Sequence, residues 1–263
     1  MRLWAVFKKS VRQQLRDRLG FLLTVLTAPF FVLLYGLFFA GEPGAAPAAA
    51  SGAARPFDAY VPGLLVFSVI MLVFSAAMSV AREVESGAIL RLKLTPLSTL
   101  ELLAGSSTVQ LLLGAISVAL TMLTAEALGF ESHGKSPVIL LLALIACLSS
   151  IGVGMVVASL SRSTTRAFLI ASVAMFLLML FSGVIFPRPR AEVFEVGGRS
   201  VGLFDALPTT HLSVGLEKLL HGAAASSDLS FEVSSLLGLS VLYFVAGAIA
   251  FQRRHRLSGG AGP

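Results

Sequence analysis

Residues 82–105 read REVESGAILRLKLTPLSTLELLAG, and this charged stretch stands between two apolar runs. The runs on either side, residues 60–80 and 106–128, are each long enough to cross a bilayer as a helix, which takes about 20 apolar residues. A charged connection between two such runs is typical of a polytopic membrane protein. We therefore predict an all-α fold in which residues 82–105 mark one place where the chain leaves the membrane.

The composition favours the same class. The chain has 263 residues, of which 56% are hydrophobic and 13% charged, and its mean hydropathy is +0.88. Soluble domains carry about 25% charged residues. The one cysteine, Cys147, lies within an apolar run, so we expect neither a disulfide framework nor a metal site.

Hydropathy predicts six spans. The first follows a basic segment, but its 21 residues exceed the roughly 7–15 of a signal-peptide core, which favours a retained span over a signal peptide. An outer loop at 187–232 separates the last two. The predicted spans are 20–40, 60–80, 106–128, 138–160, 167–186 and 233–251.

The basic residues sort by side of the membrane. Fourteen of the 20 Lys and Arg residues lie in the N-terminal segment, residues 82–105, the 161–166 connection and the tail at 252–263. The positive-inside rule places these four segments, and both termini, in the cytoplasm. The pI near 10 is then a topology signal, and we expect no nucleic-acid partner.

Residues 1–19 show an apolar stripe at helical spacing. The stripe has basic residues on the remaining surface, which predicts an amphipathic helix in the cytoplasmic headgroup region. The alternative is a basic flank that only sets orientation. The stripe consists of Trp4, Phe7, Val11, Leu15 and Leu19.

Residues 129–136 match the phosphate-loop pattern G-x-x-x-x-G-K-[ST]. Such a loop works where it follows a strand and opens a helix, so that backbone N–H groups surround the phosphates. Here the match lies between two spans, on the outer side, and Pro137 follows it. We interpret it as a coincidental turn and expect no catalytic residue in this chain.

Few polar residues are candidates for a site. His211 and His221 share the outer loop without a ligand set, which favours a solvated loop. Glu126, near the outer end of span three, is a candidate pathway residue for substrate or proton handling, or it reaches the headgroups. Gln110, on the same span, is a second pathway candidate, although an interhelical hydrogen bond is the simpler expectation.

Two further patterns predict packing. Ser150, Gly154 and Ala158 recur every fourth residue in span four, which predicts a close helix contact, within one chain or between two. Residues 207–222 carry leucines at helical spacing. We expect a helix there that either lies on the outer leaflet or caps the span bundle.

Within residues 82–105, Gly87 and Pro96 divide the stretch into two parts. Ser98 and Glu101 form a capping-box pattern, so a second helix would begin there and run into span three. A two-part element anchored to two spans is suited to transmit force to the membrane domain. The alternative is a loop that rests on the headgroups.

Residues 85–98 resemble the segment after the second span in ABC-type exporter permeases of the type-2 class, which typically read E-x-G-T-hydrophobic-x-x-L-x-x-T-P-[LIV]-[SR]. Residues 182–187, SGVIFP, are similar to that family's S-G-hydrophobic-hydrophobic-F-P, and Leu207-Pro208 to its later proline. Ala88 departs from the family, where threonine is common.

The resemblance implies a homodimer or paired permease bound to two cytoplasmic ATP-hydrolysing subunits, which hold the ATP and Mg²⁺, while this chain binds no cofactor. It implies that spans two and five line the pathway, in the plasma membrane (the inner membrane of a bacterium). It also implies a coupling helix that docks on the ATPase. The expected contact residues are Glu83, Glu85, Gly87, Leu90, Arg91, Lys93, Thr95, Pro96 and Leu97.

We therefore predict the permease subunit of an ATP-driven exporter of an amphipathic, drug-like or lipid-linked substrate. The nearest alternative is a permease for polysaccharide or glycolipid export. A membrane scaffold that recruits cytoplasmic partners is a different class of function, and an intramembrane enzyme is disfavoured by the missing catalytic set.

Overall fold

A computed structural model describes residues 2–39, 56–87, 99–132, 136–182, 192–196, 199–220 and 226–257. Its helices and strands, in chain order, are α1 (Arg2–Arg16), α2 (Arg18–Phe39), α4 (Pro56–Glu85), α6 (Thr99–Ala127), α7 (Ser136–Leu160), α8 (Thr164–Phe181), β1 (Glu192–Val196), β2 (Arg199–Gly202), the 3-10 helix η1 (Leu203–Ala206), α9 (Pro208–Leu220) and α10 (Ser226–Leu257).

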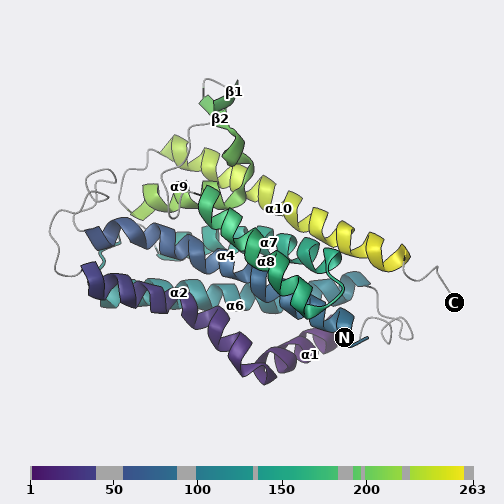
Figure 1. Cartoon of the computed structure of the whole chain (residues 1–263). Helices are drawn as coiled ribbons and strands as arrows, with labels where there is room; N and C mark the ends of the chain where they lie inside the picture. The colour runs from purple at the N-terminus through teal and green to yellow at the C-terminus, as the bar shows by residue number, and fades with distance from the viewer. Residues whose placement is uncertain are drawn as a thin grey trace.

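Six of the described helices are long and apolar enough to cross a membrane: α2, α4, α6, α7, α8 and α10. They form one bundle (Figure 1), with α1 across one end and α9 at the other. The expected all-α, polytopic fold with an N-terminal helix before the first span is confirmed. We call the end formed by α1, the last turn of α4 and the first turn of α8 the α1 end.

The helices differ from the predicted spans mainly at their ends. Helix α4 continues beyond residue 80 to Glu85, and α6 begins at Thr99, as expected for a helix that leads into span three. Helix α8 ends at Phe181, earlier than residue 186, and starts earlier, where the Ser163 side chain accepts a hydrogen bond from the Arg166 amide at 3.3 Å. Hydropathy marks the apolar residues of the bilayer core, whereas a helix can continue past that core into polar residues, as α4 does at its end and α8 at its start.

Helix α4 is the centre of the bundle. In its most apolar stretch 78% of residues are buried, against 17% in α8 and in α10. Exposed large side chains on the outer helices include Phe30, Phe176 and Val245. These apolar faces lie on helices long enough to cross a bilayer, so they suit contact with lipid or with a second protein chain.

Small residues let α7 approach α4 and α10 closely. A Cβ at Gly154 would lie 2.7 Å from the Cβ of Ala76 on α4. Gly152, on α7, meets the backbone of Tyr243 and Gly247 on α10. Because Ser150 and Ala158 are also buried, the stripe predicted in span four packs within the chain.

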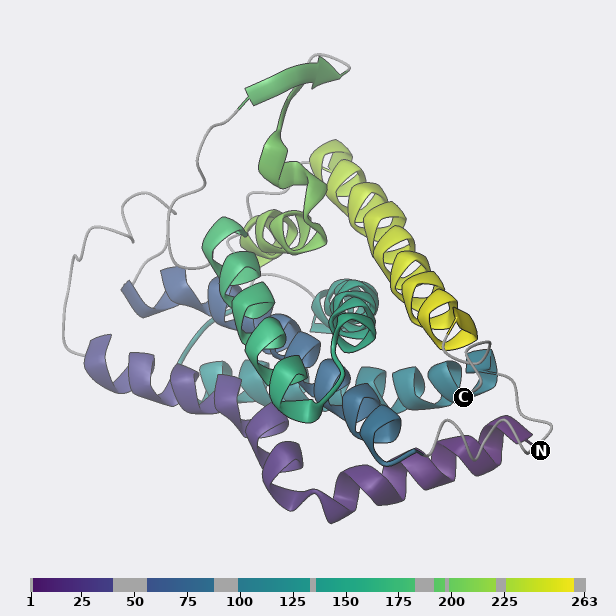
Figure 2. The same cartoon turned by 45° about the vertical axis from the view of Figure 1, so that its right-hand side comes forward.

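Within the outer loop predicted at 187–232, the described residues form secondary structure that hydropathy does not signal. Strands β1 and β2 pair antiparallel, and η1 leads into α9. Figure 2 shows the hairpin beyond α9, and α9 itself lies close to the start of α10. Leu212, Leu216 and Leu220 are fully buried, so α9 caps the bundle, the second of the two alternatives considered above.

Candidate functional site

The last turn of α4 is bonded to three other parts of the molecule, beginning with α1. Lys9 Nζ on α1 lies 3.2 Å from Glu83 Oε1, and the Glu83 side chain is only 5% exposed. A carboxylate that is almost fully removed from water needs a partner of opposite charge. The pair therefore ties the amphipathic helix to the end of the central span.

Arg82 makes the second connection, to the corner between α1 and α2. Its Nη1 donates to Asp17 Oδ2, and Asp17 Oδ1 accepts from the Gly20 amide at 3.3 Å, so Asp17 caps α2. Burial alone would raise the pKa of the Asp17 carboxyl, but hydrogen bonds from Arg82 and the Gly20 amide, with the charge of Arg82, hold that pKa below its ordinary value. Asp17 is therefore an ionised group that stabilises the corner.

Glu85 makes the third connection, to α8. Its Oε2 accepts a hydrogen bond from the Thr164 amide at 3.0 Å, in the first turn of that helix. A carboxylate is stabilised there by the unpaired amides and by the helix dipole. Spans two and five are thus linked at the α1 end.

Gly87 follows the last turn of α4 and terminates the helix. It adopts a φ of +67° and donates its amide to Val84 O at 3.1 Å, which closes the C-terminus of α4. A left-handed φ is costly for other residues, which explains glycine here. Outside the described residues lie six of the expected contact residues: Leu90, Arg91, Lys93, Thr95, Pro96 and Leu97.

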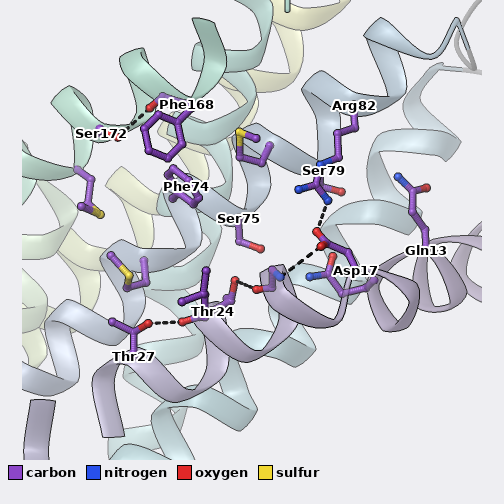
Figure 3. Close-up of a pocket in the computed structure, with 16 residues that line it drawn as sticks. Gln13, Asp17, Thr24, Thr27, Phe74, Ser75, Ser79, Arg82, Phe168 and Ser172 are labelled. Atoms are coloured by element: carbon purple, nitrogen blue, oxygen red, sulfur yellow. Dashed lines mark hydrogen bonds and ion pairs between the residues drawn. The ribbon is translucent and has the colours of Figure 1, made fainter. Parts of the chain in front are cut away.

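A cavity of about 290 Å³ opens beside these contacts, between the α1–α2 corner, α4 and α8 (Figure 3). Phe74 and Phe168, which both line it, meet edge to face with ring centroids 5.1 Å apart. Its lining residues are Gln13, Gln14, Asp17, Gly20, Leu23, Thr24, Thr27, Met71, Phe74, Ser75, Met78, Ser79, Arg82, Phe168, Ser172 and Met175.

The cavity has the character of an amphipathic binding site. Three methionines and two phenylalanines supply adaptable apolar surface, hydroxyl groups are spaced along the walls, and Asp17 and Arg82 are the charged members of the lining. Helices α4 and α8 are the second and fifth spans, the expected pathway lining, and α2 adds a third wall. The position of Asp17 opposite Arg82, 65 residues away, is not visible in the sequence.

The two candidate pathway residues lie apart. Gln110 is buried and accepts a hydrogen bond at 2.9 Å from Ser75, a lining residue, so the expected interhelical bond is present immediately behind the cavity. Glu126 is exposed at the other end of α6, roughly 24 Å away along the helix. It borders a separate apolar cavity of about 350 Å³ between α6 and α7.

The phosphate-loop match at 129–136 follows helix α6 and leads into helix α7, where a phosphate loop would follow a strand. Gly129 has a φ of +86° in the turn after α6. Residues 133–135 of the match lie outside the described part. The helical context supports the interpretation as a turn.

The expectation of a solvated His211 is wrong. The side chain is 6% exposed, with Nδ1 2.7 Å from Glu232 Oε2 and Nε2 2.9 Å from the Asp205 carbonyl oxygen. Lys218 Nζ lies 3.1 Å from Glu232 Oε1. Since α9 folds onto α10, a histidine that looks like a loop residue becomes part of a buried ion-pair cluster. His221 lies outside the described residues.

Known proteins place this architecture in a family. Residues 45–249 match the family model for the ABC-2 family transporter protein. The daunorubicin resistance ABC transporter permease protein DrrB1 of Streptomyces coeruleorubidus is 24% identical over 221 residues, which cover 83% of this chain and 75% of that protein. The family match begins after α2, takes in α4, α6, α7 and α8 and most of α10, and extends over well beyond half of the sequence. The chain therefore belongs to the ABC-2 family of transporters and is an ABC transporter permease.

Proposed function

We propose that this permease exports an amphipathic, drug-like or lipid-linked substrate, with ATP hydrolysed by a separate subunit. The observation that carries the proposal is the last turn of α4, where Arg82, Glu83 and Glu85 bond to the α1–α2 corner, α1 and α8. These bonds lie beside an apolar cavity with hydroxyl groups, which suits an amphiphile better than a polysaccharide. The drug-resistance name of DrrB1 supports the same substrate class.

Residues 82–105 act in this proposal as the coupling segment, docked on an ATP-binding subunit that holds ATP and Mg²⁺. When that subunit moves the segment, Gly87 passes the displacement into α4, and the bond between Glu85 and Thr164 passes it into α8. Both helices wall the cavity, so the motion changes its shape. A second permease and a second ATPase subunit complete the transporter.

Glu85→Ala is expected to lower the ATPase activity of the complex by about half or more while membrane insertion is unchanged. The substitution removes the bond to the Thr164 amide, so the link between α4 and α8 at the docking segment is lost. The measurement is ATP hydrolysis by the co-purified complex in lipid. Glu131→Ala, an exposed carboxylate in the α6–α7 connection, is the matched control.

The same ATPase assay tests whether the positive φ of Gly87, and not merely the presence of glycine, is needed for coupling. Gly87→Pro is incompatible with a φ of +67° and removes the amide donor, whereas Gly87→Asn tolerates the left-handed region. We expect proline to lower ATPase activity and asparagine to retain most of it. If the proline variant and Glu85→Ala both co-purify with a fully active ATPase, the coupling role is wrong.

The proposed location is the inner membrane of a bacterium with both termini in the cytoplasm. The single cysteine, Cys147, is buried, so introduced cysteines report accessibility cleanly. In intact cells a membrane-impermeant maleimide is expected to label Glu131→Cys and to leave Arg12→Cys unlabelled until the cells are broken. Both positions are exposed in the structure, and the reverse labelling pattern contradicts the orientation.

A further inference from the structure

We propose that Asp17 selects positively charged amphiphiles for the cavity between the α1–α2 corner, α4 and α8, and that Arg82 is the built-in cation that a substrate displaces. The inference rests on the proposed transport function and names the charge of its substrate. It starts from the ion pair between Asp17, at the α1–α2 corner, and Arg82, on α4, both of which line the cavity.

Asp17 is the fixed member of the pair. Its side chain is short and 28% exposed, and Oδ1 is held by the Gly20 amide while Oδ2 meets Arg82. Gly20 allows this position, because a Cβ there would lie 2.9 Å from Asp17 Cγ. The carboxylate therefore stays in place whether or not Arg82 is bound to it.

Arg82 is the movable member. Its side chain is long and 44% exposed, so the guanidinium can turn into water while its stem stays on α4. An ion pair that is this exposed to water contributes little to stability, so exchange of one cation for another costs little. Displacement by a substrate cation leaves Asp17 paired and Arg82 hydrated.

The remaining surroundings favour a cation over an anion. Asp17 and Arg82 are the two charged residues of the lining, and the neighbouring Arg16 and Arg18 are exposed and outside it. An anion that bound Arg82 would sit against the fixed Asp17 carboxylate. A cation with an apolar body would instead place its charge at Asp17 and its body against Met71, Phe74 and Met175.

The test uses two probes of the same shape and opposite charge, tetraphenylphosphonium and tetraphenylborate. Binding to the purified full chain is measured by equilibrium dialysis. We expect the natural sequence to bind the phosphonium more tightly than the borate. Asp17→Asn, which keeps a good helix cap, is expected to weaken phosphonium binding roughly fivefold and to leave borate binding unweakened.

Arg82→Gln provides the decisive comparison because it removes the competing cation. We expect it to tighten phosphonium binding roughly threefold, opposite in direction to Asp17→Asn. A purely structural ion pair predicts that both variants weaken both probes alike, with lower thermal stability. That result, equal binding of the two probes by the natural sequence, or no detectable phosphonium binding overturns the proposal.

Failure of this inference is distinguishable from failure of the proposed function. If the probes show no charge preference while Glu85→Ala still lowers ATPase activity in the complex, only the substrate charge is wrong. If Glu85→Ala and Gly87→Pro leave the ATPase unchanged, the coupling proposal fails, whatever the probes do. Binding to the isolated chain and hydrolysis by the complex are independent measurements.

Discussion

Gly247→Val is expected to abolish recovery of monodisperse protein. A side chain at Gly247 would meet the backbone of Gly152, including its carbonyl oxygen and Cα, and Gly152 in turn faces the backbone of Tyr243. Backbone on both sides leaves no flexible side chain to move aside, so α7 and α10 must separate. Overpacking of a core typically costs about 1–3 kcal/mol, and we expect this site to exceed that range.

The measurement is the yield of the monodisperse peak in size-exclusion chromatography after detergent extraction. Gly238→Val is the matched control, because Gly238 lies on the same helix and a Cβ there has nothing within 4 Å. Both changes carry the same cost in helix propensity, so a difference between them reports the contact with α7. Equal yields from the two variants would show that α7 and α10 do not pack through these glycines.

Hydropathy predicted the membrane domain because each span must satisfy its own backbone hydrogen bonds in lipid. The ends were less predictable. Glu83 and Glu85 were expected in a connecting segment, yet they continue α4, where Glu83 pairs with Lys9 and Glu85 accepts a hydrogen bond from the Thr164 amide. Charged residues mark where a chain can leave the bilayer, but the helix can continue through them when their side chains have bonding partners.

The cavity could not be predicted from the sequence, for a different reason. Helices α6, α7 and α8 are apolar on all sides, so their sequences do not specify which face meets which neighbour. The family resemblance led to Glu85 and Gly87, whereas the pairing of Asp17 with Arg82 depends on how α1 and α2 pack against α4. Prediction of such a pair requires relative helix rotation, which only packing determines.

Glu232→Ala is expected to lower the thermal stability of the purified protein by roughly 5–10 °C, because it leaves His211 and Lys218 without their shared carboxylate. His211 Nδ1 lies 2.7 Å from Glu232 Oε2, and Nε2 lies 2.9 Å from the Asp205 carbonyl oxygen. His211 is 6% exposed, so Nδ1 would lose its hydrogen-bond partner at a site that is closed to water. Lys218, 26% exposed, loses the same partner and can still reach water.

The matched control is Glu126→Ala, because Glu126 is an exposed carboxylate near the same end of the bundle. We expect its effect on stability to stay within about 0.5 kcal/mol, as for most surface substitutions. The comparison isolates burial and pairing, since both variants remove the same group from a helix. If the two melting temperatures agree, α9 is held to α10 by its leucines alone, and the ion-pair cluster contributes nothing measurable to the cap.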